Sequence, residues 1–472
     1  MKLKRNLQAS FYTYILGIPI IFIVSLLGFV YTNNLNPLMF GFLLAFFFTV
    51  LHAVRYYGML SLYAIYLYTS AFFIYDCIIF TLFGDKNFLL QYFPLRFSFE
   101  ERTGSIFLIA CYATVFITHI AYCLIPKNRY IVRMTTKPIV NNFILQKTGE
   151  IFMLVFLVPV LYKIYVQLSF IRLHGYLSIF DGSMADIHYP FWCMGSFIFF
   201  IGGYVIFFAS NPPKKRFILF SFLFLLVYGF NSLKGQRGPI ISAFLVTIFL
   251  IGRQYRIQIK LKYLIVMLIT IIGMVVALGN IRASYGDEKK NKSVIDGEFV
   301  AEIVYGQTTS RAVPLLIMDR KLDFHPYPFV FSPLLIPYYA FFYPSNGQDR
   351  ISAEHHNNIS QVTMYNLSPS THLNGGGFGG AFLAEAYDCG GFIGVIIWSI
   401  VIAFILVQYD FGLNVIPIKY RPLLFFYLLN IPTLSRGRLF GVMYDLNKII
   451  FVYMVLLLVD IRKYFKLRVN NE

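Results

Sequence analysis

Charged residues are scarce in this chain of 472 residues, where Asp, Glu, Lys and Arg together make up 13%. Soluble globular proteins carry about 25% charged residues, so this composition and a mean hydropathy of +0.66 exclude an ordinary soluble enzyme. The 40 basic residues outnumber the 22 acidic ones and give a net charge of +18. Nucleic acid is not expected as a partner, because binding it needs a basic soluble face, which the sequence does not show.

Several chemical motifs are also missing. The five cysteines have no Cys-x-x-Cys spacing, and we expect them to be small buried hydrophobic side chains rather than a disulfide framework or a metal site. There is no Walker A motif, no Gly-x-Ser-x-Gly, no His-Glu-x-x-His, no dinucleotide fingerprint and no Asp-x-Asp pair. His355 and His356 lack a third ligand at a suitable spacing, so neither a metal nor a cofactor is expected.

Apolar sequence is abundant instead, at 58% of the residues. A helix that crosses a bilayer needs about 20 apolar residues, and the chain has enough for about twelve such helices. The pattern predicts an all-α polytopic membrane protein. Its predicted spans are roughly 11–31, 37–57, 60–83, 105–126, 151–171, 191–209, 217–231, 239–252, 263–280, 391–407, 422–434 and 439–460.

Basic residues cluster in the short segments on one side of these spans, which sets the orientation by the positive-inside rule. The clusters lie at 2–5, 127–147, 214–216, 253–262, 419–421 and 462–468. With these segments in the cytoplasm, both termini are cytoplasmic. The predicted organisation is nine spans over 1–280, a large periplasmic loop with short helices over 281–390, and three spans with a tail over 391–472. Within the loop, the apolar stretch 328–343 contains three prolines, which favours a re-entrant or interface-lying element.

Some basic residues remain on the outer side, where topology does not require them. They are Lys234 and Arg237 in NSLKGQRGP, Arg282 in GNIRASYG and Arg311 in QTTSRAVPLL. Cationic groups beside glycines suit close contact with phosphate oxygens, so we interpret these four as a diphosphate-binding site. The alternative is that they extend to lipid headgroups and bind nothing specific. Arg436, Arg438, Lys163 and Arg172 are open to the same two interpretations.

A second feature is the glycine-rich segment STHLNGGGFGG at 370–380, followed by Glu385 and Asp388. Desolvation at the edge of the bilayer would raise the pKa of Glu385, which suits a general base, and His372 is the second candidate. Asn374 and Gly376 are candidate substrate contacts, and a flexible hinge is the alternative for the glycines. Tyr338 is a candidate sugar-stacking platform or part of an aromatic belt. His52 and His119 lie within spans, where we expect hydrogen bonds between helices.

KGQRGPIISA, the arginines of GNIRASYG and TTSRAVPLL, and HLNGGGFGGAFLAEAYDCGG resemble the O-antigen polysaccharide polymerase (Wzy) family. The resemblance implies a GT-C-like, metal-independent, inverting glycosyltransferase of the bacterial inner membrane. Such an enzyme transfers the growing glycan from undecaprenyl diphosphate to a new lipid-linked repeat unit on the outer face. The expected partners are the lipid-linked oligosaccharide, as donor and as acceptor, membrane lipids, a chain-length regulator and a flippase.

Three other functions stay open at this point. An O-antigen ligase-type transferase shares the architecture but uses a different acceptor. A lipid-linked oligosaccharide flippase also has about twelve spans, but it would place its charges in a central cavity. A structural or assembly role in the membrane is the third.

Overall fold

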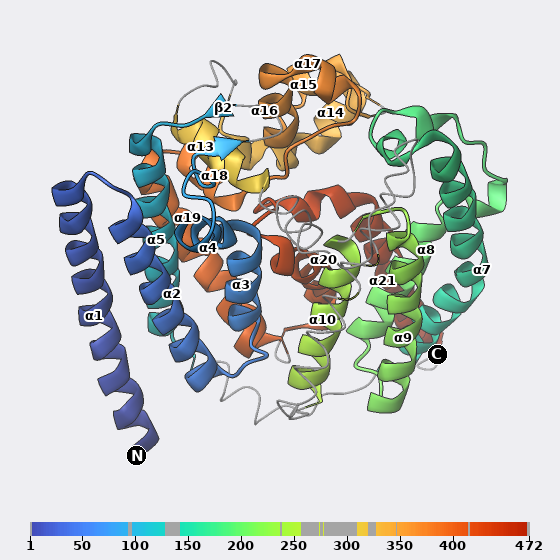
Figure 1. Ribbon diagram of the computed structural model, residues 1–472. Coiled ribbons are helices and arrows are strands. Elements are labelled where there is room, and N and C mark those ends of the chain that lie inside the picture. Colours follow the sequence, from blue (N-terminus) through green and yellow to red (C-terminus); the bar gives the residue numbers. More distant parts are fainter. Residues whose placement is uncertain are drawn as a thin grey trace.

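A computed structural model shows a bundle of long helices with short helices gathered at one end (Figure 1). The structure describes residues 2–92, 97–127, 142–236, 238–255, 309–319, 327–345, 347–413 and 416–469, and the single positions 273 and 277. In these parts of the chain, nine helical stretches are long and apolar enough to cross a membrane, which confirms the predicted fold class. They are Tyr12–Thr32, Asn36–Tyr57, Leu62–Phe83, Glu101–Leu124, Phe143–His174, Phe191–Ala209, Lys214–Ser232, Gly391–Gly412 and Gly441–Val459.

The long helices of the first half of the chain are α1 (Lys2–Thr32), α2 (Asn36–Tyr57), α3 (Leu62–Ser70) continued by α4 (Asp76–Phe83), α5 (Glu101–Leu124), α7 (Phe143–His174), α8 (Ser196–Ala209), α9 (Lys214–Ser232) and α10 (Gly238–Gln254). Three short 3₁₀ helices connect α7 to α8: η3 (Tyr176–Ile179), η4 (Ser183–Asp186) and η5 (Phe191–Cys193). The second half ends with α19 (Gly391–Val407), η8 (Gln408–Gly412), η9 (Ile418–Tyr420), α20 (Arg421–Asn430), η10 (Ile431–Thr433), η11 (Gly441–Asp445) and α21 (Leu446–Val469).

Short helices between these two halves form a cap at the upper end of the bundle in Figure 1. The cap consists of η6 (Thr309–Arg311), α13 (Ala312–Met318), η7 (Phe329–Leu335), α14 (Ile336–Phe342), α15 (Arg350–His355), α16 (Ile359–Leu367), α17 (Pro369–Leu373) and α18 (Phe382–Asp388). We call this end of the molecule the cap end. The prolines of 328–343 break that stretch into η7 and α14, and neither is long enough to cross a bilayer.

Three predicted spans need separate comment. The span at 239–252 is α10, which has 17 residues. The span at 422–434 is wrong as a full crossing, because α20 has ten residues and extends for only about 15 Å. A typical hydrocarbon core is about 30 Å thick. The span at 263–280 lies outside the described residues, apart from positions 273 and 277.

Two local features were not predicted. Strands β1 (Gln91–Tyr92) and β2 (Phe97–Ser98) pair antiparallel in the loop before α5. Between α3 and α4, the helix widens into the π-helical segment η1 (Ala71–Tyr75). Such segments arise from one extra residue in a turn and frequently lie at functional sites.

The outer surface of the bundle is apolar. Leu16, Ile20, Val24 and Leu27 on α1 are all more than half exposed, as are Leu154, Val155 and Val158 on α7. A helix with apolar side chains on its exposed face is stable when that face contacts lipid. Figure 1 shows α1 at the edge of the bundle, in agreement with this surface.

The end opposite the cap holds many of the basic residues, and we call it the basic end. There Asn142 donates its backbone N–H to the Ser210 carbonyl at 3.0 Å, which joins the start of α7 to the end of α8. Arg216 pairs with Glu150 at 2.7 Å, and Lys147 reaches the same carboxylate at 3.0 Å. The basic clusters that were predicted to be cytoplasmic therefore lie at one end of the bundle, as far as the structure describes them.

A buried carboxylate joins four elements at the basic end. Asp410 of η8 accepts hydrogen bonds from the backbone N–H groups of Leu62 at 2.8 Å and Tyr63 at 3.2 Å. It also accepts the Tyr122 hydroxyl of α5 at 2.7 Å and pairs with Arg253 of α10 at 3.2 Å. These contacts satisfy the N-terminus of α3 and neutralise a charge inside the bundle.

We expect Asp410→Ala to destabilise the fold by about 3–5 kcal/mol, because it leaves Arg253 and two helix N–H groups without their acceptor. The matched control is Glu354→Ala, which removes the solvent-exposed ion pair with Arg350. Thermal unfolding of both purified variants in detergent measures the effect. Equal unfolding temperatures for the two variants would contradict the role given to Asp410.

Candidate active site

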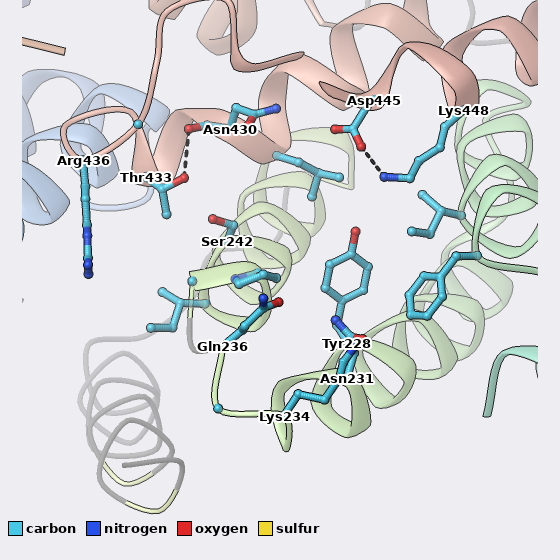
Figure 2. A pocket seen from close by; sticks show the side chains of 18 of the residues that line it. Tyr228, Asn231, Lys234, Gln236, Ser242, Asn430, Thr433, Arg436, Asp445 and Lys448 are labelled. Carbon is cyan, nitrogen blue, oxygen red and sulfur yellow. Dashed lines mark hydrogen bonds and ion pairs between the residues drawn. The ribbon is translucent and has the colours of Figure 1, made fainter. Parts of the chain in front are cut away.

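The larger cavity of the described structure lies between α9, α10 and the segment that joins α20 to α21, and its volume is about 720 Å³ (Figure 2). Residues 234–236 and Gly238 form one wall, and residues from 429–437 with Asp445 and Lys448 form another. Phe72 and Phe73, from the π-helical segment η1, line it as well. With Lys163 and other residues of 163–201, the cavity draws on four regions of the sequence: 72–73, 163–201, 228–242 and 429–448.

Cationic side chains outnumber acidic ones in the described lining of this cavity. Among the described residues that line it, four are basic (Lys163, Lys234, Arg436 and Lys448) and one, Asp445, is acidic. Asp445 and Lys448 form an ion pair one helical turn apart. Figure 2 shows Arg436 and this pair toward opposite sides of the view. The remaining excess of positive charge suits an anionic ligand.

Lys234 is the best defined of these cations. Its ammonium group donates to the Gln167 amide oxygen at 2.8 Å, and within the described parts of the chain no carboxylate lies at ion-pair distance. Burial and, to a smaller extent, the positive charge of Lys163 lower the pKa of Lys234 to about 8. A bound anion would reverse this effect, because it stabilises the protonated ammonium.

Arg436 reaches the cavity because the glycine-rich segment packs directly against it. A Cβ atom on Gly379 would lie 2.8 Å from Nε of Arg436 and 2.5 Å from the Ser310 hydroxyl oxygen. Both separations are too short for real atoms, so a side chain at position 379 would displace Arg436. The glycines of 375–380 thus serve close packing, at least at this position.

Glu385 contacts the segment between α20 and α21, which carries Arg436. Its side chain is fully buried, accepts the backbone N–H of Leu439 at 3.2 Å and lies 3.8 Å from Nε of Arg438. Arg438 in turn donates to the Asn358 amide oxygen and to the Tyr444 hydroxyl. Burial raises the pKa of Glu385 to about 8, although the Arg438 charge opposes the rise. At pH 7 this carboxyl group is therefore mostly protonated.

A second cavity of about 530 Å³ lies within the cap end. Its lining comes from η7, α14 and the start of α16, together with Phe180 and Tyr444. The two cavities share two elements. Tyr176 of η3 and Asp445 of η11 line the first, while Ile179 of η3 and Tyr444 of η11 line the second. The cavities are consequently neighbours.

The structure separates the sequence-predicted residues. Lys234 lines the first cavity, whereas Arg311 is buried elsewhere: it donates to the carbonyls of Phe88 at 2.7 Å and Gln91 at 3.1 Å, with its guanidinium 3.8 Å from the Phe88 ring centre. Arg237 and Arg282 lie outside the described residues. Arg237 stands in the sequence between Gln236 and Gly238, and both of these neighbours line the first cavity.

The remaining candidates lie in the cap, and none of them lines either cavity. His372 is buried, its Nε2 lies 3.3 Å from the Asp349 carbonyl, and burial lowers its pKa. Asn374 and Tyr338 are exposed. Gly376 offers its carbonyl to the Gln348 amide at 3.1 Å when that amide nitrogen is turned toward the loop. In the same orientation, Gln348 also donates to the carbonyls of His372 and Gly375.

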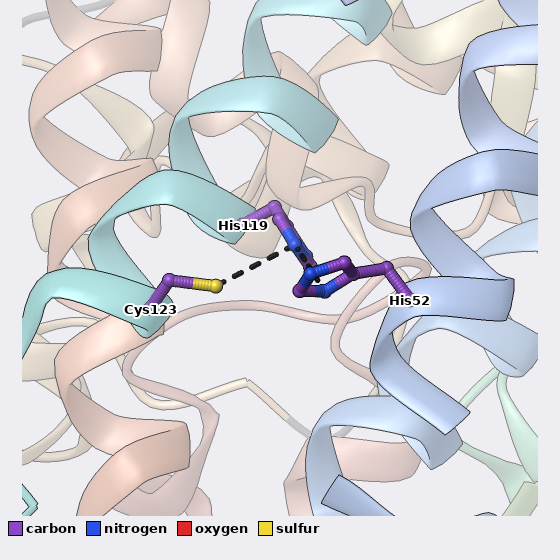
Figure 3. Close-up of side chains that lie close together, drawn as sticks. All are labelled: His52, His119 and Cys123. Carbon is purple, nitrogen blue, oxygen red and sulfur yellow. Dashed lines mark hydrogen bonds between the residues drawn. The ribbon is translucent and has the colours of Figure 1, made fainter. Parts of the chain in front are cut away.

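One group of side chains could hold a metal ion. Nε2 of His119 lies 3.0 Å from Nδ1 of His52 and 3.5 Å from Sγ of Cys123 (Figure 3). Tyr63 binds the other ring nitrogen of His119 at 2.8 Å. A chain of hydrogen bonds from Tyr63 through His119 to His52 and Cys123 accounts for this arrangement, and bonds between helices are what was expected for the two histidines.

Asp445, Lys448 and the second cavity were missed in the sequence. Asp445 and Lys448 fall at the start of the predicted span 439–460. The available signal was a pair of opposite charges three residues apart within an apolar run, because a charge inside a membrane is costly and is frequently functional.

The fold and this cavity define a polytopic membrane protein with a cationic cavity at its cap end. Residues 12–468 match the O-antigen polysaccharide polymerase Wzy family. The match covers nearly the whole chain, so the chain belongs to this family, and membership implies a membrane polymerase of O-antigen repeat units. No curated protein and no solved structure matches the chain.

The geometry of Glu385 predicts different outcomes for two substitutions. Glu385→Gln keeps a neutral acceptor for the Leu439 N–H, so near wild-type polymerisation is expected. Glu385→Ala leaves that buried N–H without an acceptor, which costs about 1–3 kcal/mol of free energy. We therefore expect the rate of polymerisation to fall about tenfold or more. The length of the glycan ladders on a gel measures polymerisation by the two variants, in cells that contain equal amounts of each protein. Complete loss in Glu385→Gln would contradict the positioning role and favour a general base.

Proposed function

We propose that this protein transfers a growing glycan from undecaprenyl diphosphate to a lipid-linked repeat unit, at the outer face of the bacterial inner membrane. The observation that carries the proposal is the cationic cavity at the cap end, whose excess of positive charge and whose Lys234, followed by Gly235, suit a lipid diphosphate. In this orientation the basic end and both termini face the cytoplasm, as the positive-inside rule requires.

In this proposal, Lys234, Arg436 and Lys163 bind the diphosphate, and Arg237, which lies outside the described residues, remains part of the proposed site. When the bond between the anomeric carbon and the diphosphate oxygen breaks, negative charge develops on the leaving group. Cations already fixed in a desolvated site stabilise that charge with little reorganisation. Arg311 acts differently, because its guanidinium already binds two backbone carbonyls and fixes the loop before α5. Arg282 remains part of the proposed diphosphate site.

Asp445 is the proposed general base, because it is the carboxylate among the described residues that line the cavity. It takes the proton of the acceptor's sugar hydroxyl as that oxygen attacks the anomeric carbon and the lipid diphosphate departs. Lys448 forms an ion pair with this carboxylate and holds it at the wall of the cavity. The displacement inverts the anomeric configuration and needs no metal. Glu385 and His372, the candidates from the sequence, then position the turn and the glycine-rich loop.

The partners follow from this reaction. The donor and the acceptor are both lipid-linked oligosaccharides, and each enters from the membrane. A flippase has to deliver them to the outer face, and a chain-length regulator would act on the product.

A deletion strain complemented with single variants tests the proposed function. Wild-type protein should restore a ladder of long glycan chains, while the empty strain should show a single repeat unit on its acceptor. Asp445→Asn should give no ladder, because loss of a general base lowers a rate by about 10²–10⁴-fold, and Asp445→Glu should restore part of it. If deletion removes every repeat unit from the surface, the ligase or flippase function replaces the polymerase.

The pKa of Lys234 predicts how donor use depends on pH. Its ammonium is charged below about pH 8 and neutral above it, so the cationic cavity loses charge as the pH rises through 8. We expect kcat/KM for the lipid-linked donor to fall between pH 7 and pH 9, because this parameter reports the free enzyme. Lys234→Arg should remove the fall, since a guanidinium stays charged. The same fall in both proteins would show that another group causes it.

A further inference from the structure

We propose that the second cavity binds uncharged sugar residues of the repeat-unit oligosaccharide. This inference rests on the proposed function, because it assigns the saccharide part of the substrate whose diphosphate occupies the first cavity. The volume of about 530 Å³ falls within the range of about 300–1,000 Å³ that is typical of small-molecule sites.

The side chains of this cavity differ in kind from those of the first. None of the described residues that line it is Lys, Arg, Asp or Glu. The polar side chains are the amides of Gln348, Asn358 and Gln361, the hydroxyls of Ser332, Tyr339, Ser345 and Tyr444, and the imidazole of His356. An amide both donates and accepts, as a sugar hydroxyl does, and an aromatic ring provides an apolar surface for the C–H groups of a sugar.

Two of these side chains have unused hydrogen-bonding capacity. The Tyr339 hydroxyl and the Gln361 amide oxygen are buried, and neither has a hydrogen-bond partner among the described residues. Buried polar groups without a partner are rare in folded proteins, because leaving one unpaired costs free energy. A ligand rich in hydroxyl groups would satisfy both.

Neighbouring contacts fix the wall of the cavity before any ligand binds. Tyr339 stacks on the His356 ring at 5.0 Å between ring centres, and His356 Nε2 lies 2.6 Å from the Tyr343 carbonyl. Asn358 begins α16, and its side-chain oxygen accepts the Ser360 N–H at 3.1 Å and the Arg438 guanidinium. Because these groups are held in place, the cavity needs little ordering to bind a saccharide.

The position of the second cavity connects it to the proposed chemistry. Tyr444 lines the second cavity, and the next residue, Asp445, lines the first. Arg438 binds Asn358 and Tyr444 on the side of the second cavity, two residues after Arg436 in the first. A saccharide in the second cavity would therefore place its next sugar near the proposed base.

Binding of the released repeat unit to purified protein in detergent tests this inference. The probe is the oligosaccharide freed by mild acid from the lipid carrier that accumulates in the deletion strain, observed by saturation-transfer NMR. Tyr339→Phe and Gln361→Leu each remove one hydrogen-bonding group, so we expect each to weaken binding by about two- to tenfold. The control Tyr31→Phe alters an exposed ring at the end of α1 and should bind like wild type.

Two further ligands separate this site from the diphosphate site. Inorganic diphosphate should bind equally to wild type and Tyr339→Phe, and more weakly to Lys234→Ala. A uronic acid oligomer of the same length should bind more weakly than the neutral repeat unit, because the lining offers no cation. Unchanged oligosaccharide binding in Tyr339→Phe and Gln361→Leu would overturn the inference, even where the glycan ladder confirms the polymerase. Intact oligosaccharide binding with no polymerase ladder would overturn the proposed function alone.

Discussion

The cost of placing a charge in an apolar interior governs the organisation of this protein. At the basic end, buried carboxylates meet that cost with partners: Asp410 pairs with Arg253, and Glu150 pairs with Arg216. At the cap end, the described lining of the first cavity has four basic side chains and one carboxylate. A desolvated excess of positive charge is unfavourable without an anion, which gives this cavity its affinity for one.

The turn between α20 and α21 depends on the cap. It carries Arg436 into the first cavity, and it is held by Glu385 from α18 and by the absence of a side chain at Gly379. The predicted catalytic segment, residues 370–385, therefore contacts the residues that carry Arg436 and does not line the cavity itself. Residues of a sequence motif, such as Glu385, can thus position the side chains that line a cavity without lining it themselves.

The sequence was sufficient for the fold class and for most spans, because apolar runs of about 20 residues have few alternative structures. It also drew attention to Lys234, because a cationic side chain beside a glycine at a span end is unusual, and this lysine lines the first cavity. It was insufficient for α20, whose apolar composition resembles that of a span but whose helix ends after ten residues. Asp445, the proposed general base, was missed because it lines the same cavity as Lys234 and Arg436, and that juxtaposition is a property of packing.

Separate cavities for the two parts of one substrate offer a physical advantage. A diphosphate is the same in every cycle, and a cationic site can bind it by charge alone, with little dependence on the sugar. A repeat unit differs between polysaccharides, and hydrogen bonds from amides and hydroxyls in a preformed site discriminate more sharply, because a mismatched hydroxyl leaves a buried group unpaired. Since η3 and η11 line both cavities, occupation of one is structurally connected to the other. Specificity and leaving-group stabilisation can then be altered independently, by substitutions on opposite sides of the same two elements.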